Sequence, residues 1–450
     1  MSDHIYIRMK TNHFCLKLFA QLNNEDISYG VLRNFFSLPY TTAGSDLDIW
    51  ISHHDVGRFN IIIERVAKQT SFHLVSYLED KFCPKYCFLN VKEGFQMDVF
   101  IGDIPFQNSP MVPEKDLLKH IVYYNGIKVV DEDFGNLLAY IKEIISNRRC
   151  NIKYTSPLMK NKDRFSKTYL EENLSLFSDD FVYLLSDSLK NDKLEGNAHY
   201  LSLTGRKTII KQSQLIYRIK KLQRIINAPG YILAIEGTDG SGKSTIIDAI
   251  TPILNEAFHN GVIYNHLRPN AIPDLGVLLG KKEKQISGTV NTDPHALKQS
   301  GVLGSLVRWG YYMIDYTFGY MKTVWPLIHT KSKVFIFDRY YYDYYIDQKR
   351  SRTTLPRWVI RLGECLVPKP DLILCLGGTP QKIFERKPET SLEEVKRQTE
   401  ALRAFCQKRK NAVWVDTTTS IAESTNKTMT AIVEMMSERF KNVELHEGID

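Results

Sequence analysis

The sequence predicts an α/β protein with two sheet-forming regions and a helical region between them. Short apolar segments alternate with longer helical stretches in 229–450, and several of these segments are apolar throughout. Strands of that kind are typical of a parallel sheet covered by helices on both faces. In 1–110 the segments alternate polar and apolar residues, as half-buried strands do, whereas 111–228 carries apolar residues at helical spacing.

These patterns divide the chain into a mixed-sheet α/β domain (1–110), a mostly helical middle region (111–228) and a doubly wound, five-stranded parallel sheet (229–450). In the first domain we expect helices at 14–22 and 55–68 and strands at 29–33, 46–51, 72–78, 86–91 and 95–101. In the middle region helical spacing recurs at 117–122 and 137–145. The strands expected in the last domain are 231–236, 262–266, 334–337, 371–376 and 413–416. Asn-Ala-Pro-Gly at 227–230 is a typical break before that domain.

Composition narrows the class of protein. The 450 residues are 43% apolar and 24% charged, which fits a folded globular chain and excludes wholesale disorder. The 59 basic and 51 acidic residues leave a net charge of +8, which suits anionic ligands but does not indicate a nucleic-acid partner. No apolar run reaches the roughly 18 residues of a membrane span. The N-terminus has no signal-peptide pattern, and seven scattered cysteines suit reduced thiols, so we expect a cytoplasmic protein.

A basic stretch lies between 204 and 224, where seven Lys and Arg residues occur without an acidic residue. Leucines and isoleucines form an apolar stripe through the same stretch. The pattern indicates either an amphipathic helix with a solvated basic face or a surface that contacts a polyanion or an anionic membrane.

The strongest motif is Gly-Thr-Asp-Gly-Ser-Gly-Lys-Ser at 237–244, which matches the P-loop pattern. A predicted strand precedes it and a predicted helix follows it, as the pattern requires. Its glycines let successive backbone N–H groups point at phosphate oxygens, and the helix N-terminus adds a favourable dipole. The lysine would reach the β- and γ-phosphates, and the serine hydroxyl would hold Mg²⁺. The nucleotide-binding residues expected here are Gly237, Thr238, Asp239, Gly240, Ser241, Gly242, Lys243, Ser244 and Thr245.

A second pair of polar residues, Asp338 and Arg339, ends the apolar strand expected at 334–337. In a doubly wound sheet, ligands gather at the carboxyl ends of the strands, so both side chains should face the P-loop. Asp338 can position the metal, and Arg339 can neutralise a second phosphate. A local ion pair at a strand end is the alternative.

These motifs, together with a further apolar strand, resemble those of a known protein family. Glu-Gly-Thr-Asp-Gly-Ser-Gly-Lys-Ser-Thr at 236–245, Asp-Arg-Tyr at 338–340 and Pro-Asp-Leu-Ile-Leu-Cys-Leu at 370–376 are similar to thymidylate kinases and their relatives. The resemblance covers 229–450 and implies a parallel sheet, ATP with Mg²⁺, and phosphoryl transfer to a phosphate monoester. It implies that Asp239 contacts a sugar hydroxyl of the acceptor. In this chain Gly240 stands where some members have an arginine. The resemblance therefore also implies a mobile lid at 385–398, in which Arg386, Lys387 and Arg397 stabilise the transferring charge.

The acceptor side departs from that family. Arg268 and Pro269 keep two residues of its Arg-Glu-Pro motif without the Glu, and Arg268 stays a candidate for substrate binding. The nearest match to the family's Asp-Arg-x-x-His is Asp-Tyr-Thr-Phe-Gly at 315–319, which lacks the Arg. The acceptor is therefore open: dTMP, another nucleoside monophosphate, a phosphorylated sugar or a glycan end. Tyrosines enrich this area and either stack on a base or sugar or pack in the core; they are Tyr311, Tyr312, Tyr316, Tyr340, Tyr341, Tyr342, Tyr344 and Tyr345.

A separate acidic pattern lies in the first domain. Asp46 and Asp48 sit at i and i+2 on a predicted strand, which puts both carboxylates on one face, and Asp98 lies on a later strand. Together they could hold a divalent metal. The Gly-Ser-Asp-Leu-Asp segment at 44–48 with Asp98 resembles the nucleotidyltransferase superfamily, which implies metal-dependent attack of a hydroxyl on a nucleoside triphosphate. That family's Gly-Ser pair is replaced by Arg33 and Asn34, so active transfer, a binding role and structural carboxylates all stay open.

The sequence therefore predicts an ATP- and Mg²⁺-dependent kinase of a small-molecule nucleotide or phosphorylated sugar. Lys243 and Arg339 would neutralise charge, Ser244 and Asp338 would place the metal, and Asp239 and Arg339 would orient the acceptor. The alternatives are metal-dependent nucleotidyl transfer through the N-terminal aspartates, in a bifunctional enzyme, and a nucleotide-gated binding protein. A homodimer is a further option.

Overall fold

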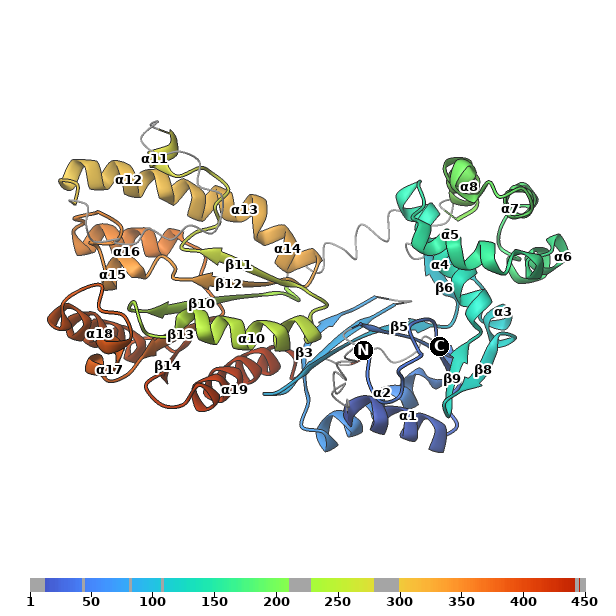
Figure 1. Ribbon diagram of the computed structural model, residues 1–450, viewed down its shortest axis with the longest axis horizontal. Coiled ribbons are helices and arrows are strands. Elements are labelled where there is room, and N and C mark those ends of the chain that lie inside the picture. The colour runs from blue at the N-terminus through green and yellow to red at the C-terminus, as the bar shows by residue number, and fades with distance from the viewer. Residues whose placement is uncertain are drawn as a thin grey trace, which may run out of the picture. The chain divides into compact units, whose positions relative to one another are not determined.

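A computed structural model describes residues 13–42, 45–80, 83–106, 109–209, 228–278, 299–441 and 445. The chain divides into two compact units (Figure 1). The N-terminal unit comprises Met1–Phe88, Phe95–Gln223 and Phe440–Asp450, and the C-terminal unit comprises Leu89–Gly94 and Arg224–Arg439. The predicted regions 1–110 and 111–228 thus share one unit. Gly44 and most of the basic stretch, from 210 to 224, lie outside the described residues.

The N-terminal unit contains a seven-stranded sheet with the strand order β3-β4-β5-β2-β1-β9-β8. Strand β1 runs antiparallel to β2 and parallel to β9, and β2 runs parallel to β5, so the sheet is mixed as predicted. Its strands are β1 (Tyr29–Val31), β2 (Leu47–Ile51), β3 (His73–Leu78), β4 (Lys85–Leu89), β5 (Gly94–Ile101), β8 (Ile121–Tyr124) and β9 (Ile127–Val130). A separate two-stranded sheet consists of β6 (Ile104–Phe106) and β7 (Ser109–Val112).

The helices of this unit include the two predicted for 14–22 and 55–68, which the structure places at α1 and α2. Side chains of Asp131, Ser166 and Ser178 accept backbone N–H groups at the starts of α4, α6 and α7, which satisfies donors that a helix start leaves unpaired. The helices are α1 (His13–Asn24), η1 (His53–Asp55), α2 (Val56–Gln69), α3 (Glu114–Leu118), α4 (Glu132–Asn147), α5 (Ile152–Lys160), η2 (Lys162–Arg164), α6 (Lys167–Asn173), α7 (Asp179–Lys190) and α8 (Leu194–Ile209).

The helix predicted through 117–122 is wrong beyond Leu118. Residues 121–130 form the antiparallel hairpin of β8 and β9 instead. Its two turn residues, Asn125 and Gly126, have φ of 47° and 77°. Two successive positive φ values are typical of the tight hairpin turn that an Asn-Gly pair favours. That pair outweighed the helical spacing of the preceding apolar residues.

The C-terminal unit contains a five-stranded parallel sheet with the order β11-β12-β10-β13-β14, which confirms the predicted doubly wound sheet. The first strand of the unit therefore lies at its centre, between the third and the fourth. The strands are β10 (Tyr231–Gly237), β11 (Val262–His266), β12 (Val334–Asp338), β13 (Leu372–Gly377) and β14 (Ala412–Asp416). Every strand agrees with its predicted position to within one residue at either end.

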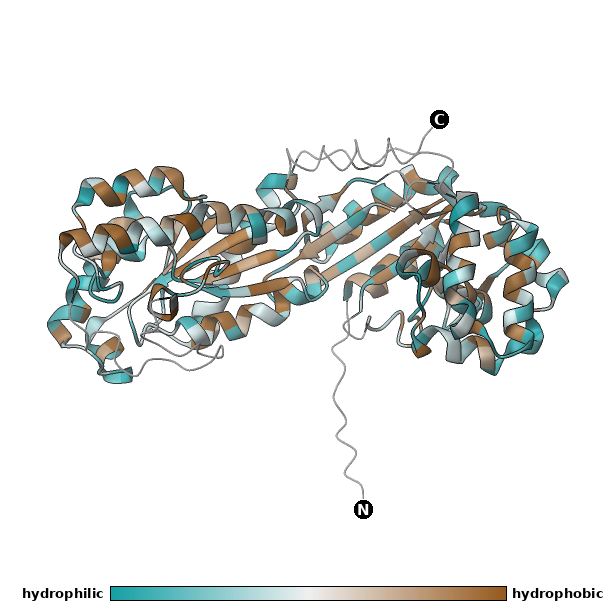
Figure 2. Cartoon of the chain, turned by 90° about the horizontal axis from the view of Figure 1, so that it is seen from above, coloured by the Kyte–Doolittle hydropathy of each residue, from teal (hydrophilic) through white to brown (hydrophobic). Residues whose placement is uncertain are grey.

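Helices cover both faces of this sheet (Figure 1). One face of β10, with Ile232 and Ala234, packs in a core that α12, α16 and α18 share, whereas Tyr231 on the other face bonds to the Met436 carbonyl of α19. Figure 2 shows the hydrophobic residues along the strands. The helices are α10 (Lys243–Ala257), α11 (Leu275–Leu278), α12 (Val302–Ile314), a π-helical turn (Asp315–Gly319), α13 (Tyr320–Thr323), α14 (Trp325–Thr330), α15 (Asp343–Ile346), α16 (Arg357–Leu366), α17 (Pro380–Arg386), α18 (Leu392–Gln407) and α19 (Ile421–Phe440).

Most of the tyrosines that enrich this unit belong to its core. Tyr316 and the four tyrosines after Arg339 (Tyr340, Tyr341, Tyr342 and Tyr344) are buried and make edge-on or tilted ring contacts with one another. Core packing therefore accounts for these five. Among the described helices of the chain, none has both the length and the apolar character needed to cross a bilayer.

Candidate active site

The P-loop joins the central strand β10 to helix α10. Gly240 and Gly242 have φ of 77° and 82°, and Gly242 caps α10, directly before its first residue. This left-handed backbone favours glycine and turns successive N–H groups toward one point. A Cβ on Gly237 would lie 2.4 Å from the Ser241 hydroxyl, so that glycine is needed for the close approach within the loop. The loop has the form that a phosphate group requires at a helix N-terminus.

Lys243 extends over this loop. Its Nζ donates to the carbonyl oxygens of Gly237 and Thr238, at 3.1 and 3.3 Å. Burial, followed by the positive charge of Arg339, lowers the pKa of Lys243 to about 8. Ser244 and Thr245 lie exposed at the start of the helix. The Thr238 and Ser241 hydroxyls are buried and have no hydrogen-bond partner in the described part of the chain.

Asp338 ends β12, next to β10 in the sheet, as the sequence predicts. Its Oδ2 accepts from the Tyr264 hydroxyl at 3.1 Å and lies 3.7 Å from His266 Nδ1. Burial opposes ionisation, but His266 and the charges of Lys243 and Arg339 together lower the pKa of Asp338 to about 2. Its Oδ1 is buried and has no partner among the described residues. An ionised carboxylate oxygen and the Ser244 hydroxyl are the ligands that Mg²⁺ prefers, so these residues fit that ion.

Asp239 of the P-loop binds two arginines. The buried Arg339 donates from Nη2 to Asp239 Oδ1 at 3.0 Å and from Nη1 to Asp343 Oδ1 at 2.8 Å. Arg350, which follows α15, donates from Nη2 to the other oxygen of Asp239. The structure thus brings the predicted Asp239 and Arg339 together and adds Arg350. Sequence reasoning missed Arg350 because it lies in a loop and belongs to no motif.

Glu236, the last residue before the P-loop glycine, is a second carboxylate that the sequence analysis did not single out. It is fully buried, and its Oε1 accepts from the backbone N–H of Tyr340 at 2.9 Å. Burial, followed by the negative charge of Asp343, raises the pKa of Glu236 to about 8. Burial also raises the pKa of Asp343, but the Arg339 guanidinium that bonds to it opposes this, so we assign the shared proton of the pair to Glu236.

Arg268 follows β11 and forms ion pairs with two carboxylates. Its Nη1 donates to Asp315 Oδ2 and its Nη2 to Asp274 Oδ1 at 2.6 Å. Asp315 is fully buried and also accepts from the backbone N–H groups of Asn270 and Ala271, each at 2.9 Å. This ion pair ties the segment after β11 to the π-helical turn.

The predicted lid spans the end of α17 and the start of α18. Arg386 donates from Nη2 to the Thr417 carbonyl at 2.9 Å. Arg397 forms a two-pronged pair with Glu394 at 2.9 and 2.7 Å and donates to the Ile346 carbonyl at 3.1 Å. Both guanidinium groups are thus occupied by neighbours outside the P-loop.

Two further arginines, Arg308 on α12 and Arg352 in the loop after α15, were also missed. Both are half-buried, and in the described part of the chain neither has a carboxylate within ion-pair distance. Burial, followed by the positive charge of Arg308, lowers the pKa of Arg352. Two cations that repel each other in this way form a favourable place for an anion.

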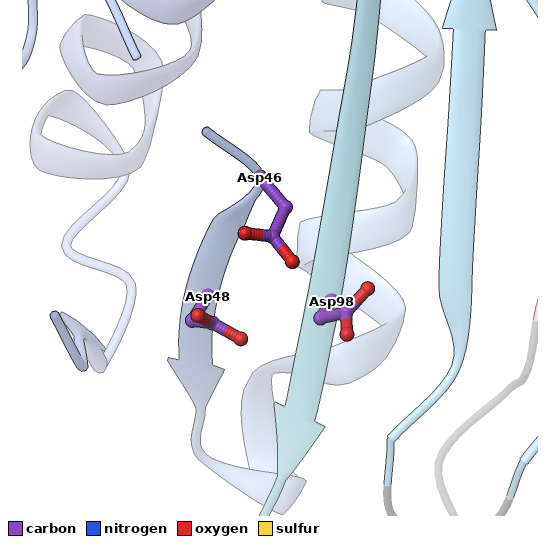
Figure 3. A group of neighbouring side chains, drawn as sticks. All are labelled: Asp46, Asp48 and Asp98. Carbon is purple, nitrogen blue, oxygen red and sulfur yellow. The ribbon is translucent and has the colours of Figure 1, made fainter. Parts of the chain in front are cut away.

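The three aspartates singled out in the N-terminal unit lie close together (Figure 3). Asp48 on β2 and Asp98 on β5 are opposite each other in register, and Asp46 directly precedes β2. Each of the three offers an oxygen within 4.8 Å of the others. Arg33 donates to Asp48, and Lys85 donates to Asp98. Burial raises the pKa of Asp48, which the neighbouring Arg33 guanidinium opposes.

Comparison with known proteins finds similar solved structures over less than half of the chain. No protein-family model and no curated protein matches the chain. Among solved structures, a thymidylate kinase from Ehrlichia chaffeensis is similar at 16% identity and a TM-score of 0.33, over 45% of this chain and 100% of that one. A thymidylate kinase from Candida albicans is similar at 19% identity and a TM-score of 0.33, over 47% and 93%. At such identities and scores, the likeness assigns no activity or substrate to this chain.

Proposed function

We propose that the C-terminal unit is an ATP- and Mg²⁺-dependent kinase. The observation that carries this proposal is the P-loop itself, in which Gly240 and Gly242 adopt left-handed φ directly before Lys243, beside Asp338 at the end of the neighbouring strand. Backbone amides would hold the β- and γ-phosphates, and Lys243 would neutralise their charge. Ser244 and Asp338 would hold Mg²⁺, which supplies charge neutralisation between the phosphates. Catalysis of this kind depends on positioning and electrostatics.

For the acceptor we propose an anionic small molecule: a nucleoside monophosphate, with dTMP as one candidate, or a phosphorylated sugar or glycan end. Arg268 is neutralised by Asp315 and Asp274, which leaves Arg308 and Arg352 as the cations best suited to a phosphate group. Asp239 would then receive a hydroxyl of the acceptor. A neutral hydroxyl compound is the alternative acceptor, and it would not need this arginine pair.

Calorimetry with MgATP and a coupled assay of ADP release test the proposal. The wild-type protein should bind MgATP and should release ADP with at least one member of a panel of nucleoside monophosphates and sugar phosphates. Lys243→Met should abolish both, whereas Lys322→Met, an exposed lysine on α13, should change neither. Binding of MgATP without turnover of any acceptor would favour a nucleotide-gated binding protein. The absence of MgATP binding by the wild-type protein would refute both.

A second candidate function, metal-dependent nucleotidyl transfer, rests on the meeting of Asp46, Asp48 and Asp98 within 4.8 Å. A divalent ion would have to displace Arg33 from Asp48 and Lys85 from Asp98. Titration with Mn²⁺, followed by electron paramagnetic resonance, tests this: wild type should bind one ion more than the double variant Asp48→Asn with Asp98→Asn. Equal Mn²⁺ binding by both proteins would exclude the site.

A further inference from the structure

The P-loop contains a carboxylate that two guanidinium groups share. Arg339 is balanced, because it also pairs with Asp343 at 2.8 Å. Arg350 hydrogen bonds through its guanidinium to Asp239, and its side chain is only 14% exposed. The nearest further carboxylate oxygen, Asp347 Oδ2, lies 3.7 Å from Arg350 Nε, which has no hydrogen-bond partner among the described residues. Arg350 is therefore a largely shielded cation whose shortest hydrogen bond to a carboxylate is to the P-loop residue Asp239.

Neither the P-loop nor the predicted lid supplies an equivalent guanidinium group, and the lid lysine, Lys387, pairs with Glu389 at 3.0 Å. Gly240 follows Asp239 directly, has a φ of 77°, and would place a Cβ 2.6 Å from the Ile383 carbonyl oxygen. A long side chain is therefore excluded at that position. Arg386 is bound to the Thr417 carbonyl and Arg397 to Glu394. Among the described arginines, only Arg339 and Arg350 donate to a P-loop carboxylate.

The position of Arg350 suits a charge that develops during phosphoryl transfer. As the bond from the γ-phosphorus to the bridging oxygen of ATP breaks and a bond to the acceptor oxygen forms, negative charge spreads over the transferred group and the ADP that leaves. A guanidinium fork can contact two such oxygens at once. Because burial already holds Arg350 out of water, little solvent would need to be displaced when it exchanges one anionic partner for another.

We infer that Arg350 is the catalytic arginine of this site: its guanidinium moves from Asp239 to the oxygens of the transferring phosphoryl group as negative charge develops there. The inference rests on the proposed kinase function and adds to it the residue that stabilises the transition state. No covalent step involves Arg350. The phosphoryl group passes from ATP to the acceptor oxygen, and ADP takes up the bonding electron pair.

Aluminium fluoride with MgADP provides a test that needs no acceptor, because the planar fluoride complex imitates the transferring group. We expect the wild-type protein to bind MgADP at least tenfold more tightly when aluminium fluoride is present. Arg350→Ala should bind MgADP within twofold of wild type and should lose this gain. Added guanidinium ion, at concentrations below those that unfold the protein, should restore part of it. Lys349→Ala, which removes an exposed positive charge one residue away, should keep the full gain.

The outcomes separate the inference from the proposed function. If the wild-type protein does not bind MgADP or MgATP, the kinase proposal is wrong and the role of Arg350 falls with it. If wild type binds MgADP but shows no gain with aluminium fluoride, or if Arg350→Ala keeps the full gain, only the inference is overturned. A thermal melt of Arg350→Ala, with a Tm near that of wild type, shows that any lost gain does not come from unfolding.

Discussion

Glu236 shows how burial beside a second carboxyl group, Asp343, favours the neutral form of a carboxyl group. The raised pKa of Glu236, about 8 against an ordinary value of 4.5, means that the folded protein binds a proton there that the unfolded chain releases. The stabilising contribution is therefore fully present below about pH 4.5 and is lost as the pH rises toward 8. Protonation of Glu236 therefore contributes to the stability of the folded protein.

Glu236→Gln should remove this pH dependence. The amide keeps an oxygen for the Tyr340 N–H and cannot ionise. We expect the variant to match wild type in stability near pH 5 and to exceed it at pH 8 by about 2 °C or more in Tm. Thermal melts between pH 4.5 and 8.5 measure this difference. Parallel pH profiles for the two proteins would contradict the assignment of the proton to Glu236.

The buried pair of Arg268 and Asp315 should matter more for folding than for recognition. Arg268→Ala leaves the Asp315 carboxylate in the core without its cation, which costs about 3–5 kcal/mol. Urea unfolding should show a lower midpoint with an unchanged slope. Arg268→Met combined with Asp315→Asn should recover part of the loss, because no charge is then left buried. A fully stable Arg268→Ala variant with weakened acceptor binding would instead favour the predicted substrate role.

At the scale of the element, the P-loop and α17 are packed too closely for a side chain at position 240. Gly240→Ala would place its methyl group 2.6 Å from the Ile383 carbonyl oxygen and in a backbone region that costs alanine about 1 kcal/mol. We expect the loop to shift and MgATP binding to weaken by about tenfold, which is about 1.4 kcal/mol. Calorimetry measures this change.

Gly310→Ala is the matched control. Gly310 lies inside α12, where an added Cβ meets no atom within 4 Å. Alanine there should stabilise the protein by about 0.5–1 kcal/mol, because glycine loses more backbone freedom in a helix, and it should leave MgATP binding unchanged. Equal effects of the two substitutions would mean that glycine content, and not the shape of the loop, determines binding.

Elements were predictable from sequence where a local pattern is decisive. The strands β10, β12 and β13 are mostly apolar and buried along their whole length, so their positions follow from their apolar runs, and the P-loop follows from the spacing of its glycines. Arg350, by contrast, is identified only by its contact with Asp239, 111 residues away along the chain. No local pattern records such a contact. The hairpin at 121–130 does contain a local turn motif, Asn125-Gly126, but the helical spacing of the apolar residues at 117–122 favoured a helix instead.

At the scale of the molecule, each unit contains its own candidate site, and neither set of residues is shared. Asp46→Asn with Asp48→Asn should therefore leave ADP release by the C-terminal unit unchanged, and Lys243→Met should leave Mn²⁺ binding by the N-terminal unit unchanged. Measuring both activities on both variants checks this independence. Loss of both activities in either variant would show that the sites depend on each other.

The homodimer stays a prediction. Light scattering tests it, because a homodimer should have twice the monomer mass of 52.1 kDa.

The lowered pKa of Lys243 predicts that nucleotide binding is coupled to proton binding. With a pKa of about 8, part of the Lys243 population is neutral in mildly alkaline solution, and an arriving polyphosphate would favour its ammonium form. Association should therefore draw a hydrogen ion from the medium at pH 8. The observed heat should then differ between Tris and phosphate in proportion to their ionisation enthalpies, and affinity should decline as the solution becomes more alkaline.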